Sequence, residues 1–282
     1  MAQSGAMSLP PKRWQRSTRL QAAAVTLTLL AGPAAATQQA AAPAGAMPPL
    51  QVRYQAYVVG MPVVDFDFRL DEDGVDYTLG GQVKTVGLLR LFYRMDLRTL
   101  SEGRIAASDL RPRFHEQMLR ARGKDRSARL DYPGDGTVAT ALVPADDPGR
   151  PKPTPQQTVN TADPLTTLLA IGRTVARQGR CEGRFAVYDG RRRYDIVLGD
   201  DHIERPEKAA GYAYDGEVRR CSVAAVKIAG FSWDQDYSPH TTEGRVWFAT
   251  PRPGAPALPV RIDFGSSWGF VTVRLTEIEP PK

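Results

Sequence analysis

The chain has 282 residues, of which 42% are hydrophobic and 24% are charged. This composition is ordinary for a globular protein and excludes a chain that is mostly disordered or mostly membrane-spanning. The formal net charge is +6, but residues 1–36 hold four basic residues and no acidic one, so the rest of the chain carries only +2. We therefore expect no nucleic-acid partner, because such binding depends on many uncompensated Lys and Arg side chains.

Residues 1–36 have the layout of a secretory signal peptide. Four basic residues between positions 12 and 19 precede an apolar stretch at 20–32, and the small residues around Ala36 fit a cleavage site. The apolar stretch is shorter than the about 20 residues of a transmembrane helix, and an uncleaved membrane anchor is the alternative. We expect export to the periplasm with cleavage near Ala36.

Residues 37–49 are rich in Ala and Pro and predict a flexible leader. From Leu50 onward, apolar and polar residues alternate with period two, which predicts β-strands with one buried face. The clearest case is a strand at 64–70 that turns at 71–74 into a second strand at 75–79. Similar patterns occur at 52–58, 185–187, 194–198, 212–226, 246–249, 260–264 and 270–278.

One segment has helical periodicity instead. Asp163 and Pro164 suit the N-cap and the first position of a helix, apolar residues follow at spacings of three and four, and Gly179 suits its end. Most connections between strands are short, which favours antiparallel pairing. We expect a mainly β fold, in which a curled antiparallel sheet, half-barrel or barrel-like, packs around one α-helix at 163–178.

A loop with five prolines spans residues 144–158 and is the alternative place for a domain boundary. Neither half of the chain has enough predicted strands to close a sheet without exposed edges. We therefore expect a single β-rich domain over residues 50–282.

Cys181 and Cys221 are the two cysteines of the chain. An even number of cysteines in an exported protein indicates a disulfide, and two free thiols that bind a metal are the alternative. Cysteines this far apart, without clustered histidines, make a poor metal site. We expect a disulfide between Cys181 and Cys221, no metal and no cofactor.

Catalytic motifs are absent from the sequence, which has no nucleophile elbow, no metalloprotease motif and no glycine-rich phosphate loop. His115, His202 and His240 are isolated, although a triad can assemble in space from distant residues. Asp65 and Asp67 form either a carboxylate pair for acid–base chemistry or, as we favour, part of a solvated strand face. We expect no catalytic residue.

Clusters of arginine and of apolar residues are the candidate binding features. Seven Arg and Lys at 111–129 and the run 191–193 suit anionic groups such as lipid head groups, or form a solvated rim balanced by acids. In a strand, the first and third arginines of the run share one face. Residues 86–93 form either a core turn or an exposed loop that contacts lipid or a partner. The expected ligand-binding residues are Arg191, Arg193, Leu88, Leu89, Phe92 and Trp233.

Several motifs occur in a characteristic order, namely Tyr54 to Gly60, Asp163-Pro164-Leu165, Asp189 to Tyr194, Tyr214-Asp215-Gly216 with Cys221, and Leu258-Pro259-Val260 followed by residues 269–275. Together they resemble the bacterial domain-of-unknown-function family 3108 over about residues 50–279. The resemblance implies an exported β-rich protein and supplies no catalytic residue. A looser similarity, in architecture alone, is to the half-barrel carriers that move lipoproteins across the periplasm and hold acyl chains between a sheet and a helix.

The sequence supports three functional hypotheses. The first is a periplasmic protein of envelope maintenance that shelters an apolar or acyl-chain ligand, with Arg191 and Arg193 at an anionic head group and peripheral contact with the membrane. The second is a structural protein with a solid core that docks an envelope protein through residues 86–93 or an edge strand. The third and least supported is a hydrolase of envelope polymers that uses His202 or His240.

Overall fold

The computed structural model describes residues 47–106, 109–145, 150–205, 213–231, 241–266 and 269–279. The expected signal peptide, the first ten residues of the expected leader, Trp233 and His240 lie outside these ranges. None of the helices within them has the length and apolar character needed to cross a membrane.

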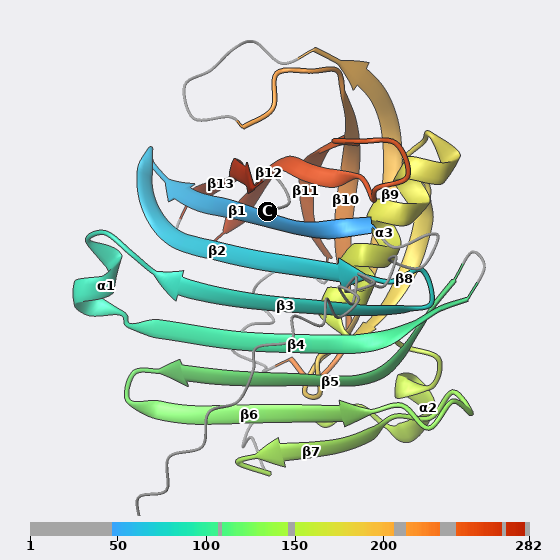
Figure 1. Cartoon of the computed structure of the whole chain (residues 1–282). Coiled ribbons are helices and arrows are strands. Elements are labelled where there is room, and N and C mark those ends of the chain that lie inside the picture. Colours follow the sequence, from blue (N-terminus) through green and yellow to red (C-terminus); the bar gives the residue numbers. More distant parts are fainter. Residues whose placement is uncertain are drawn as a thin grey trace, which may run out of the picture. The chain divides into compact units, whose positions relative to one another are not determined.

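The described residues form one antiparallel sheet of 13 strands with few helices (Figure 1). The fold is therefore mainly β, as expected. The strands are Met47–Val58 (β1), Met61–Glu72 (β2), Asp76–Thr85 (β3), Met95–Ala106 (β4), Asp109–Ala121 (β5), Lys124–Asp131 (β6), Ala139–Val143 (β7), Gly183–Tyr188 (β8), Arg193–Glu204 (β9), Val218–Ala229 (β10), Thr241–Ala249 (β11), Leu258–Ser266 (β12) and Gly269–Glu279 (β13).

The sheet consists of two meanders that are joined through the first and last strands. β1 to β7 pair in chain order, β8 to β13 do the same, and β1 pairs with β13. The outer strands β7 and β8 are not sheet neighbours, so the sheet is curled but not closed into a barrel. Their ends still approach each other, since the hydroxyls of Thr140 in β7 and Tyr188 in β8 lie 3.4 Å apart.

The N-terminal boundary differs from the expectation. β1 begins at Met47, which pairs with Glu72 of β2, so residues 47–49 belong to the sheet rather than to a leader. Prolines are tolerated here because strand ends place fewer demands on backbone N–H groups than strand interiors do.

Strands β4 to β7 have no counterpart in the sequence analysis, which assigns no strand between residues 95 and 143. For β4 and β5 the reason is the polar character of their buried face. The inward positions of β4 and β5 include Ser101 and His115, both buried, so hydrophobicity does not alternate clearly with period two. Main-chain pairing of β4 with β3 and of β5 with β4 determines these two strands instead.

The main helix, α3, spans Pro164–Gln178 and confirms the expected helix. Asp163 is its N-cap and accepts hydrogen bonds from the N–H groups of Leu165 and Thr166 at 3.0 and 2.9 Å. Gly179 ends it in the left-handed region with φ of 63°. The face that packs on the sheet includes Leu165, Leu169, Ile171 and Val175.

Two shorter helices complete the described structure, α1 at Leu89–Phe92 and α2 at Pro155–Thr158. α2 lies inside the proline-rich segment, so the last four residues of the loop expected over 144–158 form a helical turn. A capping box between Thr154 and Gln157, with Pro155 at the first helical position, accounts for this turn.

The two ends of the sheet carry different helices (Figure 1). The turns that follow β1, β3, β5 and β12 lie at one end together with α1, which we call the α1 end. At the opposite end, α3 contacts the sheet. Arg173 of α3 forms a 2.7 Å ion pair with Glu72, and Thr166 forms a 2.8 Å hydrogen bond with the Tyr77 hydroxyl.

The core has two clusters of buried side chains. The larger one joins β1 to β3, β12 and β13 to Leu165 and Leu169 of α3. The second one surrounds the disulfide between Cys181 and Cys221, whose Cα atoms lie 5.5 Å apart, and packs it against Ile171 and Val175. The expected disulfide is therefore confirmed, and it fixes the segment before β8 to β10.

Candidate ligand-binding site

An apolar cavity of about 650 Å³ opens at the α1 end of the sheet. Its volume lies within the range of small-molecule sites. All but two of its lining residues, Gly87 and Ser266, are apolar. The lining consists of Ala56, Val58, Met61, Pro62, Val63, Val64, Phe66, Gly87, Leu88, Leu89, Phe92, Phe264, Ser266, Val271 and Val273.

Strand register brings these side chains to one wall. Ala56 of β1 pairs with Val64 of β2 on one side and with Val273 of β13 on the other. Directly paired residues point to the same face, and residues two apart along a strand do so too. The alternating apolar positions of the three strands therefore build a continuous apolar surface on the inner face.

The segment 86–93 lies at the mouth of the cavity. The N–H of Val86 donates to the carbonyl oxygen of Val63 over 2.9 Å, which ties the segment to β2. Gly87 has φ of 57°, and a Cβ atom there would lie 2.7 Å from the Pro62 carbonyl oxygen, so the close approach requires glycine. The segment is exposed rather than a core turn, and its residues 89–92 form α1.

A second apolar cavity of about 50 Å³ lies between β1, β2, β3, α3 and residues 256–259. Leu50, Val52 and Tyr54 of β1 line it, on the same face as Ala56. The rings of Tyr54 and Phe68, with centroids 6.2 Å apart, stand between the two cavities in the strand register. The inner face thus carries one apolar track that leads from the α1 end to α3, interrupted by aromatic rings.

The expected ligand residues are divided by the structure. Leu88, Leu89 and Phe92 line the apolar cavity. Arg191 and Arg193 are absent from its described lining, and the expectation that they meet the head group of a ligand held there is not met.

The two arginines also differ from each other. β9 begins at Arg193, so Arg191 lies in the preceding turn and the two do not share a strand face. The Arg193 side chain is 11% exposed and its guanidinium binds Asp195 at 2.5 Å and the Gln157 carbonyl oxygen at 2.9 Å. It is therefore a buried structural group that fixes α2 to β9.

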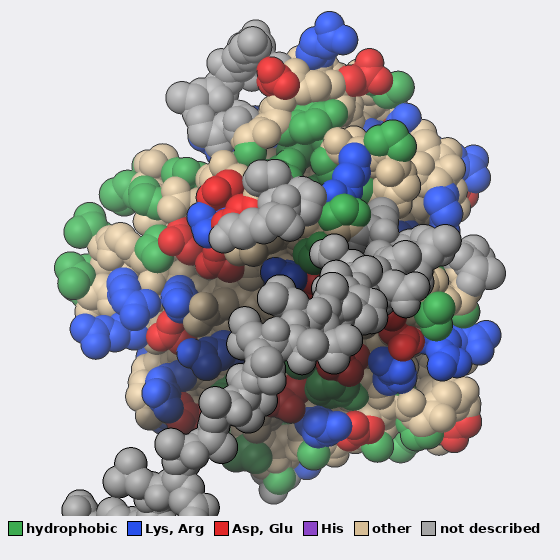
Figure 2. Space-filling view, viewed as in Figure 1, with side chains coloured by type: hydrophobic (Ala, Val, Ile, Leu, Met, Phe, Trp, Pro, Cys, Tyr) green, Lys and Arg blue, Asp and Glu red, His purple; other side chains and the backbone are tan. Residues whose placement is uncertain are grey.

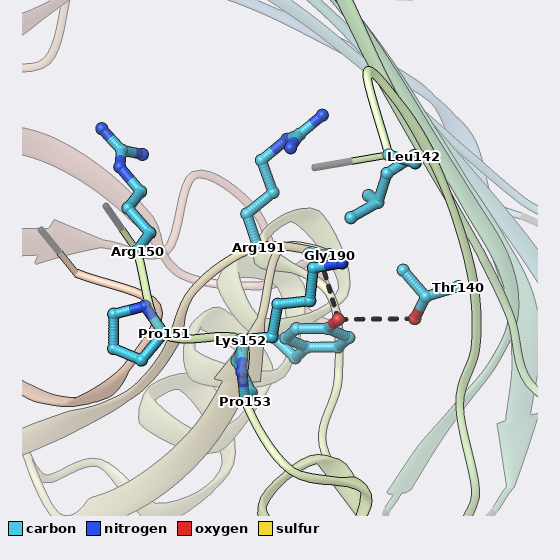
Figure 3. A pocket seen from close by; sticks show the side chains of 10 residues that line it. Thr140, Leu142, Arg150, Pro151, Lys152, Pro153, Gly190 and Arg191 are labelled. Carbon is cyan, nitrogen blue, oxygen red and sulfur yellow. Dashed lines mark hydrogen bonds between the residues drawn. The ribbon is translucent and has the colours of Figure 1, made fainter. Parts of the chain in front are cut away.

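Arg191 lines another cavity, of about 320 Å³, between β7 and the loop before α2. Its guanidinium donates to the carbonyl oxygens of Val143 and Pro144 at 3.1 and 2.9 Å. Figure 3 shows Arg150 and Arg191 extending in the same direction, with Thr140 on another side of the cavity. This site is basic and distinct in its lining from the apolar cavity.

Other charged residues singled out in the sequence face outward. Arg120 pairs with Asp125 at 2.8 Å, and Arg129 pairs with Asp131 at 2.8 Å, which is the arrangement of a solvated rim. Asp67 accepts from Arg53 at 3.1 Å on the outer face, next to the pair of Gln55 and Asp65. The solvated strand face is therefore the correct interpretation of the two aspartates.

A buried polar cluster that the sequence analysis did not recognise joins β4, β5 and α3. The Ser101 hydroxyl donates to Asp163 at 2.6 Å and lies 2.8 Å from His115 Nδ1. All three residues are at most 1% exposed. Burial raises the pKa of Asp163, but hydrogen bonds from His115, Ser101 and Thr166 outweigh it and hold that pKa below its ordinary value.

The cluster contains the residue types of a catalytic triad in a different arrangement. Because the Ser101 proton points to Asp163, the Ser101 oxygen accepts from His115 Nδ1 and is not activated by it. The carboxylate also caps α3 and accepts from the Thr166 hydroxyl at 2.6 Å. The cluster therefore holds α3 on the sheet. Only the N-cap role of Asp163 could be recognised in the sequence. Its partners Ser101 and His115 lie far from it along the chain, so the cluster itself has no local signal.

A comparison with protein-family models gives the relationship of the chain to known proteins. The model described as "Protein of unknown function (DUF3108)" matches residues 53–276. The chain belongs to the DUF3108 family. The resemblance expected from the motifs at 50–279 is therefore confirmed.

This DUF3108 chain matches none of the curated proteins. Among solved structures it is similar to a β-barrel-like protein of the domain of unknown function DUF1849 from Brucella abortus, at 9% sequence identity and a TM-score of 0.49. The similarity covers 84% of this chain and 99% of the other. Within its described ranges, the DUF3108 chain has no group of three or more His, Cys, Asp and Glu side chains arranged to hold a metal ion.

Proposed function

We propose that this protein is an exported binding protein of the bacterial envelope that shelters an acyl chain or a similar apolar ligand in the cavity at the α1 end. The observation that carries the proposal is the apolar lining of that cavity, together with its volume of about 650 Å³. The cavity is open to solvent, so its apolar wall contacts water unless a ligand covers it, and the hydrophobic effect favours an apolar ligand there.

The geometry of the inner face supports a chain-like ligand. The cavity leads along β1 and β2 towards the smaller cavity beneath α3, and the intervening side chains are Tyr54, Phe66 and Phe68. An extended hydrocarbon chain gains about 0.8 kcal/mol for each methylene that it buries. Six buried methylenes therefore supply about 5 kcal/mol, which corresponds to a Kd of about 0.2 mM before the cost of association is subtracted, so tighter binding requires a longer buried chain.

The disulfide between Cys181 and Cys221 supports the proposed compartment. Disulfides persist in oxidising environments such as the periplasm and are rare in the cytosol. The signal peptide proposed for residues 1–36 supplies the route of export. Determining the N-terminal residue of the protein recovered from the periplasm tests that route, and we expect it to follow Ala36.

The test of ligand binding uses native mass spectrometry on protein purified from the periplasm without detergent. We expect a stoichiometric excess mass that dissociates as a lipid or fatty acid. Protein that carries no excess mass and fails to bind an added fluorescent fatty acid would contradict the proposal, and crosslinking for a docked protein partner would be the next experiment.

A pair of adjacent substitutions tests whether the ligand binds in the cavity. Val271 lines the cavity, whereas Thr272 points to the other face of β13. Val271→Trp fills space that two or more methylenes of the ligand would occupy, so we expect the affinity for the fluorescent fatty acid to fall at least about tenfold. Thr272→Trp adds the same side chain outside the cavity, and we expect it to leave the affinity unchanged. An equal effect of both variants would contradict the assignment.

A further inference from the structure

Large apolar side chains surround the mouth of the cavity on its outside. Of the twelve exposed large hydrophobic residues in the described part of the chain, half lie at the α1 end. They come from the β1–β2 turn, from the segment 86–93 and from the start of β13. We call them the apolar rim, which consists of Val59, Met61, Leu88, Leu91, Phe92 and Phe270, each between 51% and 86% exposed.

Such a grouping marks an interaction surface, because apolar side chains from separate segments rarely gather in water without a partner. Leu91 and Val59 are informative, since both are exposed and neither belongs to the cavity lining. Their exposure is therefore not explained by a ligand inside the cavity.

Basic side chains lie beside the rim. The segments 90–96 and 120–126 contain six basic residues and two acidic ones, and Arg90 pairs with Asp96 while Arg120 pairs with Asp125. We call the exposed side chains of Arg94, Arg122 and Lys124 the basic belt. The two segments contact each other, since the N–H of Arg122 donates to the Arg94 carbonyl oxygen at 3.3 Å and the Arg122 guanidinium lies 5.0 Å from the centre of the Tyr93 ring. Figure 2 shows hydrophobic side chains next to Lys and Arg side chains at the end of the molecule that carries α1.

We propose that the α1 end docks on the surface of a lipid bilayer that contains anionic lipids. The apolar rim inserts between acyl chains while the basic belt contacts phosphate groups, the combination that holds peripheral proteins at a membrane. The charges decide between a bilayer and an apolar protein surface. A partner protein requires a matched acidic patch, whereas an anionic membrane presents phosphate at every position around the rim.

Docking also connects the bilayer to the cavity. Met61, Leu88 and Phe92 belong both to the apolar rim and to the cavity lining. An acyl chain can therefore pass between bilayer and cavity along apolar side chains without crossing water. This last step rests on the proposed function, whereas docking itself does not.

The experiment measures flotation of the purified protein with vesicles of phosphatidylcholine, with and without phosphatidylglycerol. We expect binding to vesicles that contain phosphatidylglycerol, and we expect it to weaken as salt is raised. The double variant Val59→Ser/Leu91→Ser should lower vesicle binding at least about tenfold, since it removes two inserted apolar side chains. Ile203→Ser, which removes an exposed apolar side chain from the other end of β9, is the matched control and should bind like the unchanged protein.

The basic belt is tested separately. Arg94→Gln and Lys124→Gln should each lower binding to the anionic vesicles roughly fivefold, and Arg104→Gln, at the far end of β4, should not. Vesicle binding that is absent, or that is equal in the rim variants and in Ile203→Ser, would overturn the docking proposal.

The two proposals have different outcomes in these variants. Val59→Ser/Leu91→Ser should lose vesicle binding and still bind a fluorescent fatty acid in solution, while Val271→Trp should show the reverse. A protein that binds vesicles and never binds the fatty acid would overturn the ligand proposal and leave the docking proposal standing.

Discussion

The hydroxyl of Ser101 donates a 2.6 Å hydrogen bond to the carboxylate of Asp163, which lies 62 residues later in the chain. The bond joins the middle of β4 to the N-cap of α3, and His115 of β5 completes the contact at 3.3 Å from the same carboxylate. The helix that closes one end of the curled sheet is therefore fixed by a buried polar cluster, in addition to its apolar face.

The first prediction concerns the stability that this cluster contributes. We expect Asp163→Ala to lower the free energy of unfolding by about 2–4 kcal/mol, since it removes a helix cap and leaves buried donors unpaired. Asp73→Ala is the control, because Asp73 also accepts from two backbone N–H groups but is exposed. Urea unfolding followed by circular dichroism measures both variants. Similar losses of unfolding free energy in the two variants would show that burial of the cluster adds nothing to stability.

The second prediction concerns pH. The pKa of Asp163 lies below its ordinary value in the folded protein, so the unfolded chain binds the proton first as pH falls. The stabilisation from Asp163 is therefore complete above its ordinary pKa of 3.8 and is lost as pH falls below that value towards the folded pKa. We expect Asp163→Asn to flatten the acid limb of a plot of unfolding free energy against pH.

A salt series provides the control for the pH prediction. Asp125 also has a lowered pKa, caused first by its hydrogen bond from Arg120, but that pair is exposed to solvent. High salt should reduce the effect of Asp125→Asn and leave that of Asp163→Asn, because buried groups are screened much less. An acid limb that is unchanged in Asp163→Asn would contradict the prediction.

The third prediction concerns the disulfide. Cys181 and Cys221 are separated by 40 positions, and a loop of that length corresponds to at most about 4 kcal/mol of stabilisation. We expect Cys181→Ala/Cys221→Ala to lower the melting temperature and to make it insensitive to reductant. The unchanged protein should melt lower with reductant than without it. A melting temperature that is equal under both conditions would show that the bridge does not constrain the fold.

The fourth prediction concerns the aromatic rings between the two cavities. A Cβ atom on Gly81 would lie 2.5 Å from Cδ1 of Phe68, whereas one on the adjacent Gly80 would meet only Leu100, at 3.9 Å. We expect Gly81→Ala to displace the Phe68 ring and to destabilise the protein by about 1–3 kcal/mol. Gly80→Ala should change stability by less than about 1 kcal/mol. Urea unfolding compares the two variants directly. Equal effects on stability would contradict the placement of the Phe68 ring against Gly81.

The main elements with strong local signals were predictable from the sequence. Asp163 and Gly179 mark the two ends of α3. The Asp163 side chain accepts from backbone N–H groups of the first turn, and Gly179 adopts the left-handed conformation that ends a helix, so both signals are local in the sequence. The hairpin of β2 and β3 follows from the alternation at 64–70 and from the turn after it. The strands β4 and β5 were not predictable in this way, because their inner face holds the buried polar residues Ser101 and His115.

The candidate site was predictable in part. The unusual apolar segment at 86–93 identified Leu88, Leu89 and Phe92, which line the cavity. The run of arginines suggested one anionic site, but Arg193 is committed to Asp195, and Arg191 lines a different cavity. Charge density along a chain does not say which acids lie nearby in space.

The sequence by itself determined the mainly β character, the position of α3 and the membership of the DUF3108 family, because periodicity, caps and motif order are local properties. The tertiary structure decided the rest. Pairing of β1 with β13 brings residues more than 200 positions apart to one wall, such as Ala56 and Val273, and only this pairing creates the apolar cavity. Contacts between distant segments carry no local signal, and for that reason the cavity, its rim and the buried cluster around Asp163 appear only in the folded chain.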